Sequence, residues 1–141
     1  MNTRWMTEPE AAGWLLTCSE TCTAMGLAGF AGIEFLQMAR VFVGEWKGPN
    51  WICTWPEYVE HAAARFAEQA IHNIREHVRR EREAADGFPA RHVSLQIDGE
   101  PVHFWTGRDP RWLIAARAYA VAAAVLRSVN VTDRAAMVVL Q

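Results

Sequence analysis

The chain has 141 residues, of which 51% are hydrophobic and 21% are charged, and its formal net charge is −2. A disordered chain is excluded, because this much apolar side chain can offset the entropy that folding removes. A slightly acidic protein has no overall basic field, so nucleic acid is an unfavourable partner. The length predicts one globular domain over residues 1–141.

The sequence predicts a cytoplasmic location. Its first ten residues lack the charged and apolar pattern of a secretory signal, and three cysteines are an odd number for a disulfide framework. Two apolar stretches, 24–43 and 110–126, carry charged side chains that are costly inside a bilayer. We therefore expect reduced thiols and no membrane contact.

Two helices are predicted in the first 45 residues. Thr7 and Glu10 have the spacing of a capping box at a helix start. An apolar stripe follows at steps of three and four residues, made of Ala11, Leu15, Cys18, Cys22 and Met25. Three glycines weaken the helix beyond this stripe and predict a turn or kink near Gly26–Gly29. The second helix, over about 30–45, is apolar on most of its circumference and is predicted to be the central helix.

The rest of the chain predicts two longer helices around a hairpin. The segment 55–85 is amphipathic, with Thr54 as a candidate cap. Alternating apolar residues on both sides of Asp98-Gly99 predict a β-hairpin over about 91–106. Asp109-Pro110 predicts the start of a last long helix, followed by a short C-terminal one. The expected fold class is mainly α (α+β), a bundle of about four main helices with one β-hairpin before the last long helix.

No metal site or cofactor is predicted. Cys18 and Cys22 lie one helical turn apart, and Cys53 and His61 would be the additional ligands, but zinc sites use short and recognisable ligand pairs. Buried free cysteine is common, so the favoured interpretation packs both thiols in the core. The acids and histidines of the segment 55–85 fall largely opposite its apolar stripe and are interpreted as a solvated face.

Glu34 and Arg117 each interrupt an otherwise apolar helix. A buried unpaired charge is costly, so each side chain either reaches water along its own stem or finds a partner. A sharper hypothesis pairs the two with each other in the core. Arg108 and Arg111 flank a helix start, where free amides and guanidinium groups can hold an anion. The favoured interpretation there is a capped helix with two exposed arginines.

Seven tryptophans are many for this length. Tryptophan is enriched in binding hot spots, so Trp51, Trp55 and Trp105 are the predicted contact residues for a protein partner. Nothing in the chain has the pattern of a serine elbow, a Walker loop or a dinucleotide-binding loop, so an enzyme is the less favoured class.

These observations rank first a non-enzymatic protein-binding module, a small accessory or inhibitor-type protein of bacterial or mobile-element origin. A homodimer is the simplest expected assembly, because the apolar last helix exceeds what a small monomer needs. One alternative is a helical domain that binds an anionic metabolite or nucleotide through Arg108, Arg111 or Arg117. A further alternative is a metal-binding helical protein that uses the cysteines or His61.

Overall fold

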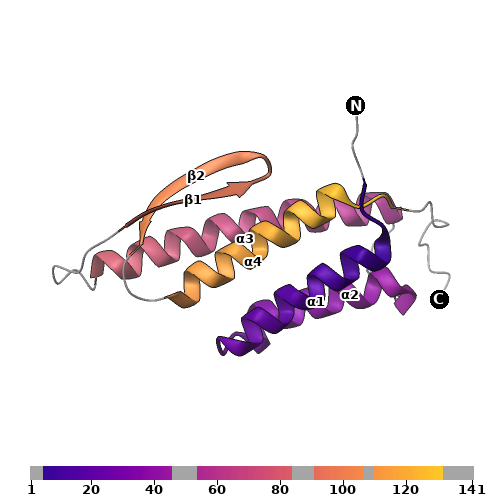
Figure 1. Cartoon of the computed structure of the whole chain (residues 1–141), viewed down its shortest axis with the longest axis horizontal. Coiled ribbons are helices and arrows are strands. Elements are labelled where there is room, and N and C mark those ends of the chain that lie inside the picture. The colour runs from indigo at the N-terminus through magenta and orange to yellow at the C-terminus, as the bar shows by residue number, and fades with distance from the viewer. Residues whose placement is uncertain (1–4, 46–53, 84–90, 107–109, 132–141) are drawn as a thin grey trace.

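The computed structural model of the protein describes residues 5–45, 54–83, 91–106 and 110–131 (Figure 1). Within these residues the elements are α1 (Glu8–Ala24), η1 (Ala28–Gly32), α2 (Ile33–Arg40), η2 (Val41–Glu45), α3 (Trp55–Glu83), β1 (Arg91–Ile97), β2 (Glu100–Thr106) and α4 (Pro110–Ser128). The predicted class, mainly helical with one β-hairpin before the last long helix, is confirmed. The short C-terminal helix predicted after Asn130 or Thr132 lies largely outside the described residues.

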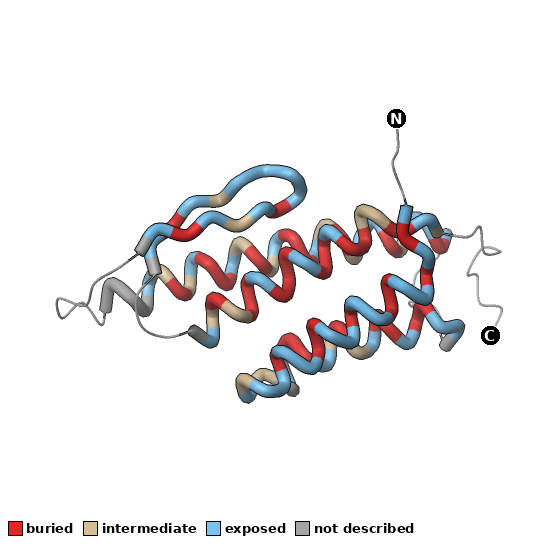
Figure 2. The backbone as a smooth tube through the Cα atoms, in the orientation of Figure 1, coloured by how far each residue is buried: buried red, intermediate tan, exposed pale blue. Residues whose placement is uncertain are grey.

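The elements form three layers (Figure 1). The long helices α3 and α4 run side by side in the middle, the hairpin covers one face of this pair, and α1 with α2 covers the other. Buried residues gather where the layers meet, and the hairpin turn is exposed (Figure 2). None of the described helices is long and apolar enough to cross a membrane.

The first layer begins and turns as its sequence predicts. The Thr7 hydroxyl accepts a hydrogen bond from the Glu10 amide at 3.2 Å, and the Glu10 carboxylate accepts one from the Thr7 amide at 3.1 Å, which completes the capping box. Gly26 has a φ of +78°, so the chain turns there. Gly32 lets the two helices approach, because a Cβ at this position would lie 3.0 Å from the Thr23 hydroxyl.

The prediction that the second helix is central was wrong. Ile33 is 40% exposed and Val43 is 60% exposed, so α2 and η2 form an outer element with one buried face. The central pair is α3 with α4. Its core contains an aromatic cluster in which Phe35 of α2 contacts Phe66 of α3 and Tyr119 of α4 edge-on, with ring centroids 5.3 and 4.9 Å apart. These contacts join the first layer to the second.

Local signals also explain α3 and α4. Thr54 caps α3, because its hydroxyl accepts a hydrogen bond from the Glu57 amide at 3.2 Å while the Glu57 carboxylate accepts one from the Thr54 amide at 3.2 Å. Pro110 occupies the first position of α4, as expected for a residue with fixed φ and no amide hydrogen. Its predicted cap, Asp109, lies outside the described residues.

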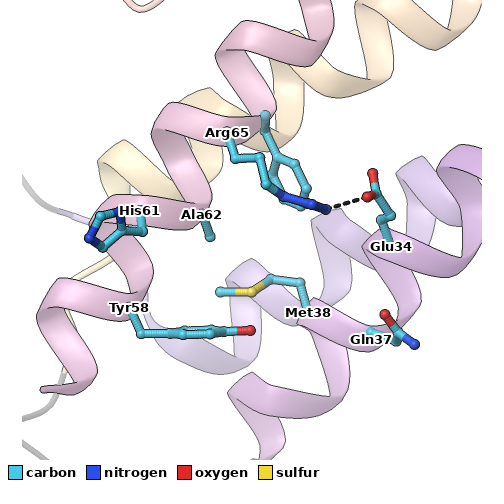
Figure 3. A pocket seen from close by; sticks show the side chains of 8 residues that line it. Glu34, Gln37, Met38, Tyr58, His61, Ala62 and Arg65 are labelled. Carbon is cyan, nitrogen blue, oxygen red and sulfur yellow. Dashed lines mark hydrogen bonds and ion pairs between the residues drawn. The ribbon is translucent and has the colours of Figure 1, made fainter. Parts of the chain in front are cut away.

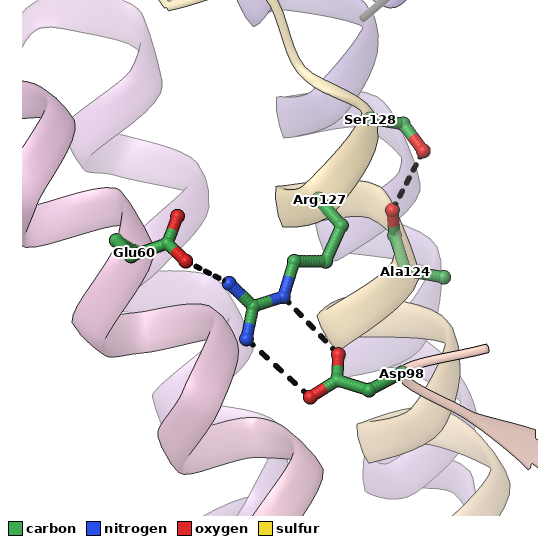
Figure 4. A network of polar contacts seen from close by, with 5 residues as sticks. All are labelled: Glu60, Asp98, Ala124, Arg127 and Ser128. Atoms are coloured by element: carbon green, nitrogen blue, oxygen red, sulfur yellow. Dashed lines mark hydrogen bonds and ion pairs between the residues drawn. The ribbon is translucent and has the colours of Figure 1, made fainter. Parts of the chain in front are cut away.

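The hairpin is fixed by its turn and by one arginine. Asp98 and Gly99 both have positive φ, +52° and +80°, which is the two-residue turn that this dipeptide favours. Val93, Ile97 and Phe104 point inward and are buried. Arg127 of α4 donates to the Asp98 carboxylate, with Nε 3.1 Å from Oδ1, and forms an ion pair with Glu60 of α3 (Figure 4). The turn is therefore anchored to both central helices.

Candidate functional site

One hollow lies between α2 and α3 and encloses about 220 Å³. Its lining residues are Glu34, Gln37, Met38, Tyr58, His61, Ala62, Arg65 and Phe66 (Figure 3). The Glu34 carboxylate is its most constrained group, since one oxygen accepts from Arg65 and the other from the hydroxyl of Tyr119. The sequence hypothesis that Glu34 pairs with Arg117 is therefore wrong. Arg117 is exposed and lies against α1 instead.

The main polar feature of this pocket is the Glu34 carboxylate, held in place by hydrogen bonds from Arg65 and Tyr119. Burial of Tyr119, reinforced by its hydrogen bond to Glu34, raises the pKa of the phenol well above its ordinary value of 10. Tyr119 therefore stays protonated and donates to Glu34 at neutral pH. The lining contains no serine, threonine or cysteine.

A second hollow is an apolar groove between α1 and α4, with a volume of about 310 Å³. Its lining residues are Trp14, Thr17, Cys18 and Thr21 from α1, and Ile114, Arg117, Ala118 and Val121 from α4. Trp14 is 52% exposed and Val121 is 40% exposed. Arg117 is the one charged residue of the lining, and it makes no hydrogen bond or ion pair within the described part of the chain.

The two described cysteines belong to the core. Cys18 and Cys22 are both buried, which confirms the predicted packing. Burial, with the neighbouring Cys22, raises the pKa of the Cys18 thiol to about 12, and burial raises that of Cys22 to about 11. Cys53 lies outside the described residues. Across the described ranges, no group of three or more histidine, cysteine, aspartate or glutamate side chains is placed to hold a metal ion.

These two thiols are expected to resist alkylation in the folded protein. A pKa raised from 9 to about 11 leaves Cys22 about a hundredfold less thiolate at pH 8 than an unperturbed thiol. In a Cys53→Ser variant, we expect iodoacetamide to modify both remaining cysteines much more slowly in buffer than in urea, followed by mass spectrometry. Equal rates in the two conditions would contradict the burial of this pair.

The tryptophans predicted as contact residues divide between core and surface. Trp55 is fully buried, so its prediction as a partner contact was wrong. Trp105 is 61% exposed on β2 and is available for contact. Trp51 lies outside the described residues. The sequence analysis missed two further exposed indoles, Trp5 at 69% and Trp14 at 52%.

The predicted anion-binding arginines are not brought together in the described residues. Arg108 lies outside them, and Arg111 and Arg117 are exposed on α4. The histidines His61 and His72 are exposed on α3, as the predicted solvated face requires. The buried face of α3 differs from its predicted stripe by two polar residues, because Asn73 and His77 are fully buried. Their spacing of four residues was the signal that could have placed them together.

The outward face of the hairpin gathers aromatic and imidazole rings. His92 contacts His103 in a stacked arrangement, with ring centroids 5.1 Å apart, and contacts Trp105 edge-on at 5.4 Å. The strand register places His92 directly opposite Trp105, and His103 opposite Ser94. All four of these side chains are exposed. Trp105 is thus part of an ordered cluster rather than an isolated surface indole.

Comparisons with known proteins add no family. No protein-family profile matches the chain, and no curated protein and no solved structure matches it significantly.

Proposed function

We propose that this chain is a non-enzymatic protein-binding module, a small accessory or inhibitor-type protein whose hairpin contacts the partner. The observation that supports this most is the exposed Trp105 held against His92 on the outward face of the hairpin. Tryptophan provides a large apolar contact with little loss of side-chain entropy, and it is enriched among residues that dominate binding energy. The indole is preordered, which reduces the entropic cost of binding.

The chemistry of this face favours an acidic partner surface. The outward-facing side chains carry hydroxyl, amide, imidazole and indole groups and no carboxylate: they are His92, Ser94, Gln96, Pro101, His103 and Trp105. Imidazole and indole N–H groups donate hydrogen bonds, and carboxylates are strong acceptors for them. The proposed partner therefore presents carboxylates around an apolar contact for Trp105.

The hairpin is a suitable platform because it is fixed to the helices. Its inner face is buried, and Arg127 ties the turn to α3 and α4. A partner that binds the outer face would meet a surface that needs little rearrangement. The polar pocket around Glu34 supports an enzyme less well, since both carboxylate oxygens are already engaged by Arg65 and Tyr119.

Substitution of Trp105 tests the proposal. We expect Trp105→Ala to weaken binding of a partner by about 30-fold, the loss typical of a hot-spot residue. Partners are captured from host lysate by wild type, by Trp105→Ala and by Trp5→Ala, which removes an equally exposed indole elsewhere. A captured acidic protein is then purified and titrated against all three. Equal affinity for wild type and Trp105→Ala would overturn the proposal.

A further inference from the structure

The α1/α4 groove is unused by the proposed function and lies in a different layer from the hairpin. The two helices run antiparallel along it (Figure 1), and a backbone bridge between Met6 and Val129 joins the start of α1 to the end of α4. Trp14 and Val121 each lie eight residues along the chain from this bridge, so they are at similar heights along the groove. Trp14 stands beside the groove with half of its surface exposed. The face therefore carries both a large apolar side chain and a groove that can receive such a side chain from another molecule.

The two helices of this face carry charges of opposite sign. Every formally charged side chain of α1 is acidic, namely Glu8, Glu10 and Glu20. Every formally charged side chain of α4 is basic, namely Arg111, Arg117 and Arg127. Most of these charged side chains already form hydrogen bonds or ion pairs within the protein. Glu8 accepts from Trp55, Glu10 completes the α1 cap, and Arg127 holds the hairpin.

One exposed charge on each helix is left without such an interaction. Glu20 of α1 and Arg117 of α4 are exposed, and neither makes a hydrogen bond or ion pair with another residue that the structure describes. Arg117 lines the groove itself. An occupant that supplies one apolar side chain and one carboxylate would satisfy both the hollow and the guanidinium group.

We infer that this occupant is a second copy of the chain, bound through the same face. A two-fold axis in the interface, parallel to the helices, would place α1 of each copy opposite α4 of the other. Trp14 of one protomer then covers the groove of its partner near Val121, and Glu20 of one approaches Arg117 of the other. A two-fold axis in the interface but perpendicular to the helices would instead place α1 of one copy against α1 of the other, so that acidic side chains would face each other.

The small area of the face favours weak association between the two copies. Two adjoining helices of 17 and 19 residues present a footprint of about 25 by 20 Å, or about 500 Å² per copy. Buried surface of this order lies at the low end for specific protein interfaces. A reversible dimer with a micromolar dissociation constant is the expected result.

Sedimentation velocity between about 1 and 200 µM tests the dimer, since this range brackets a micromolar constant. The wild type is expected to shift from monomer to dimer. Arg117→Glu and Glu20→Arg each place like charges in both copies of the contact, and each is expected to weaken the dimer about tenfold. An equimolar mixture of these two variants is expected to restore association, because both contacts then join opposite charges.

The controls separate surface effects from folding. Arg75→Glu changes the charge of an exposed arginine on α3, a helix that contributes no residue to the lining of the groove, and is expected to dimerise like the wild type. Circular dichroism and the thermal midpoint verify that Arg117→Glu and Glu20→Arg fold. Trp14→Ala tests the apolar contact independently of charge and is expected to weaken the dimer.

Three outcomes would overturn the inference. The first is a wild-type monomer at every concentration, and the second is a mixture of the charge variants that stays monomeric. The third is groove occupation by another class of ligand, shown as a thermal shift of a monomeric wild type with decanoate that Arg117→Glu abolishes. The dimer and the hairpin proposal can fail separately, because they use different surfaces of the protein. Trp105→Ala is therefore expected to dimerise like the wild type, and a failure of the dimer would not contradict the hairpin proposal.

Discussion

Replacing Trp55 with alanine is expected to lower the free energy of unfolding by about 3 to 5 kcal/mol, the range for removing a large buried aromatic side chain. Trp55 is fully buried at the start of α3. Its ring meets Phe42 edge-on at 5.3 Å and stacks on Tyr58 at 5.8 Å. Its Nε1 donates to the Glu8 carboxylate at 2.8 Å. The substitution removes the packing and the donor together.

A Trp55→Phe variant separates these two contributions. It keeps a six-membered aromatic ring but removes the five-membered part of the indole with the N–H group that serves Glu8, so we expect a smaller cost, about 1 to 3 kcal/mol. Urea unfolding followed by far-UV circular dichroism measures both variants. Trp105→Ala is the matched control, since an exposed indole should change stability by about 0.5 kcal/mol or less. A Trp55→Ala protein as stable as this control would contradict the assigned core.

The parts of the fold that the sequence predicted well are those with local causes. A capping box needs only residues three positions apart, and Thr7 with Glu10 forms one. The turn at Asp98-Gly99 depends on two backbone conformations that these residues favour. Each signal is complete within a few residues of chain. The order and type of the elements could therefore be read before any contact between them was known.

What the sequence left open depends on contacts between distant residues. α4 is rich in alanine, which fits equally well on a buried or an exposed face, so the phase of Arg117 could not be read. The same lack of contrast hid the true partners of Glu34, which come from α3 and α4. For Trp55 the signal was present, since Val59 and Ala63 continue its face at steps of four residues.

The candidate surfaces also divide into features with local causes and features that depend on contacts between distant residues. Alternation along β2 already placed His103 and Trp105 on one face of the strand, opposite Phe104. The stacking of His92 on His103 required the register across the hairpin, which a correct turn fixes. The groove beside Trp14 required the packing of α1 on α4, elements separated by most of the chain. No periodicity within one helix reveals such a hollow.

The link between Glu34 and Tyr119 is expected to contribute measurably to stability. Glu34→Ala removes the acceptor of a phenol that is 1% exposed, and we expect it to cost about 1 to 3 kcal/mol. Tyr119→Phe removes the hydroxyl and leaves Arg65 to serve the partly exposed carboxylate, at an expected cost of about 1 kcal/mol. The double variant should cost less than the sum of the two, because both changes remove the same hydrogen bond. Urea unfolding of all four proteins measures this coupling, and strict additivity would show that the two groups act independently.

Alkaline titration provides a second measurement of the same contact. The folded-state pKa of Tyr119 lies above its ordinary value of 10, so its contribution to stability is present below pH 10 and is lost as the pH rises further. The chain has two tyrosines, and absorbance at 295 nm reports the ionisation of both. We expect the Tyr119 phenol to ionise only when the protein unfolds, as a step in the absorbance that coincides with the loss of far-UV circular dichroism. In Tyr119→Phe this step should disappear, whereas its persistence would contradict the assignment of the protected phenol to Tyr119.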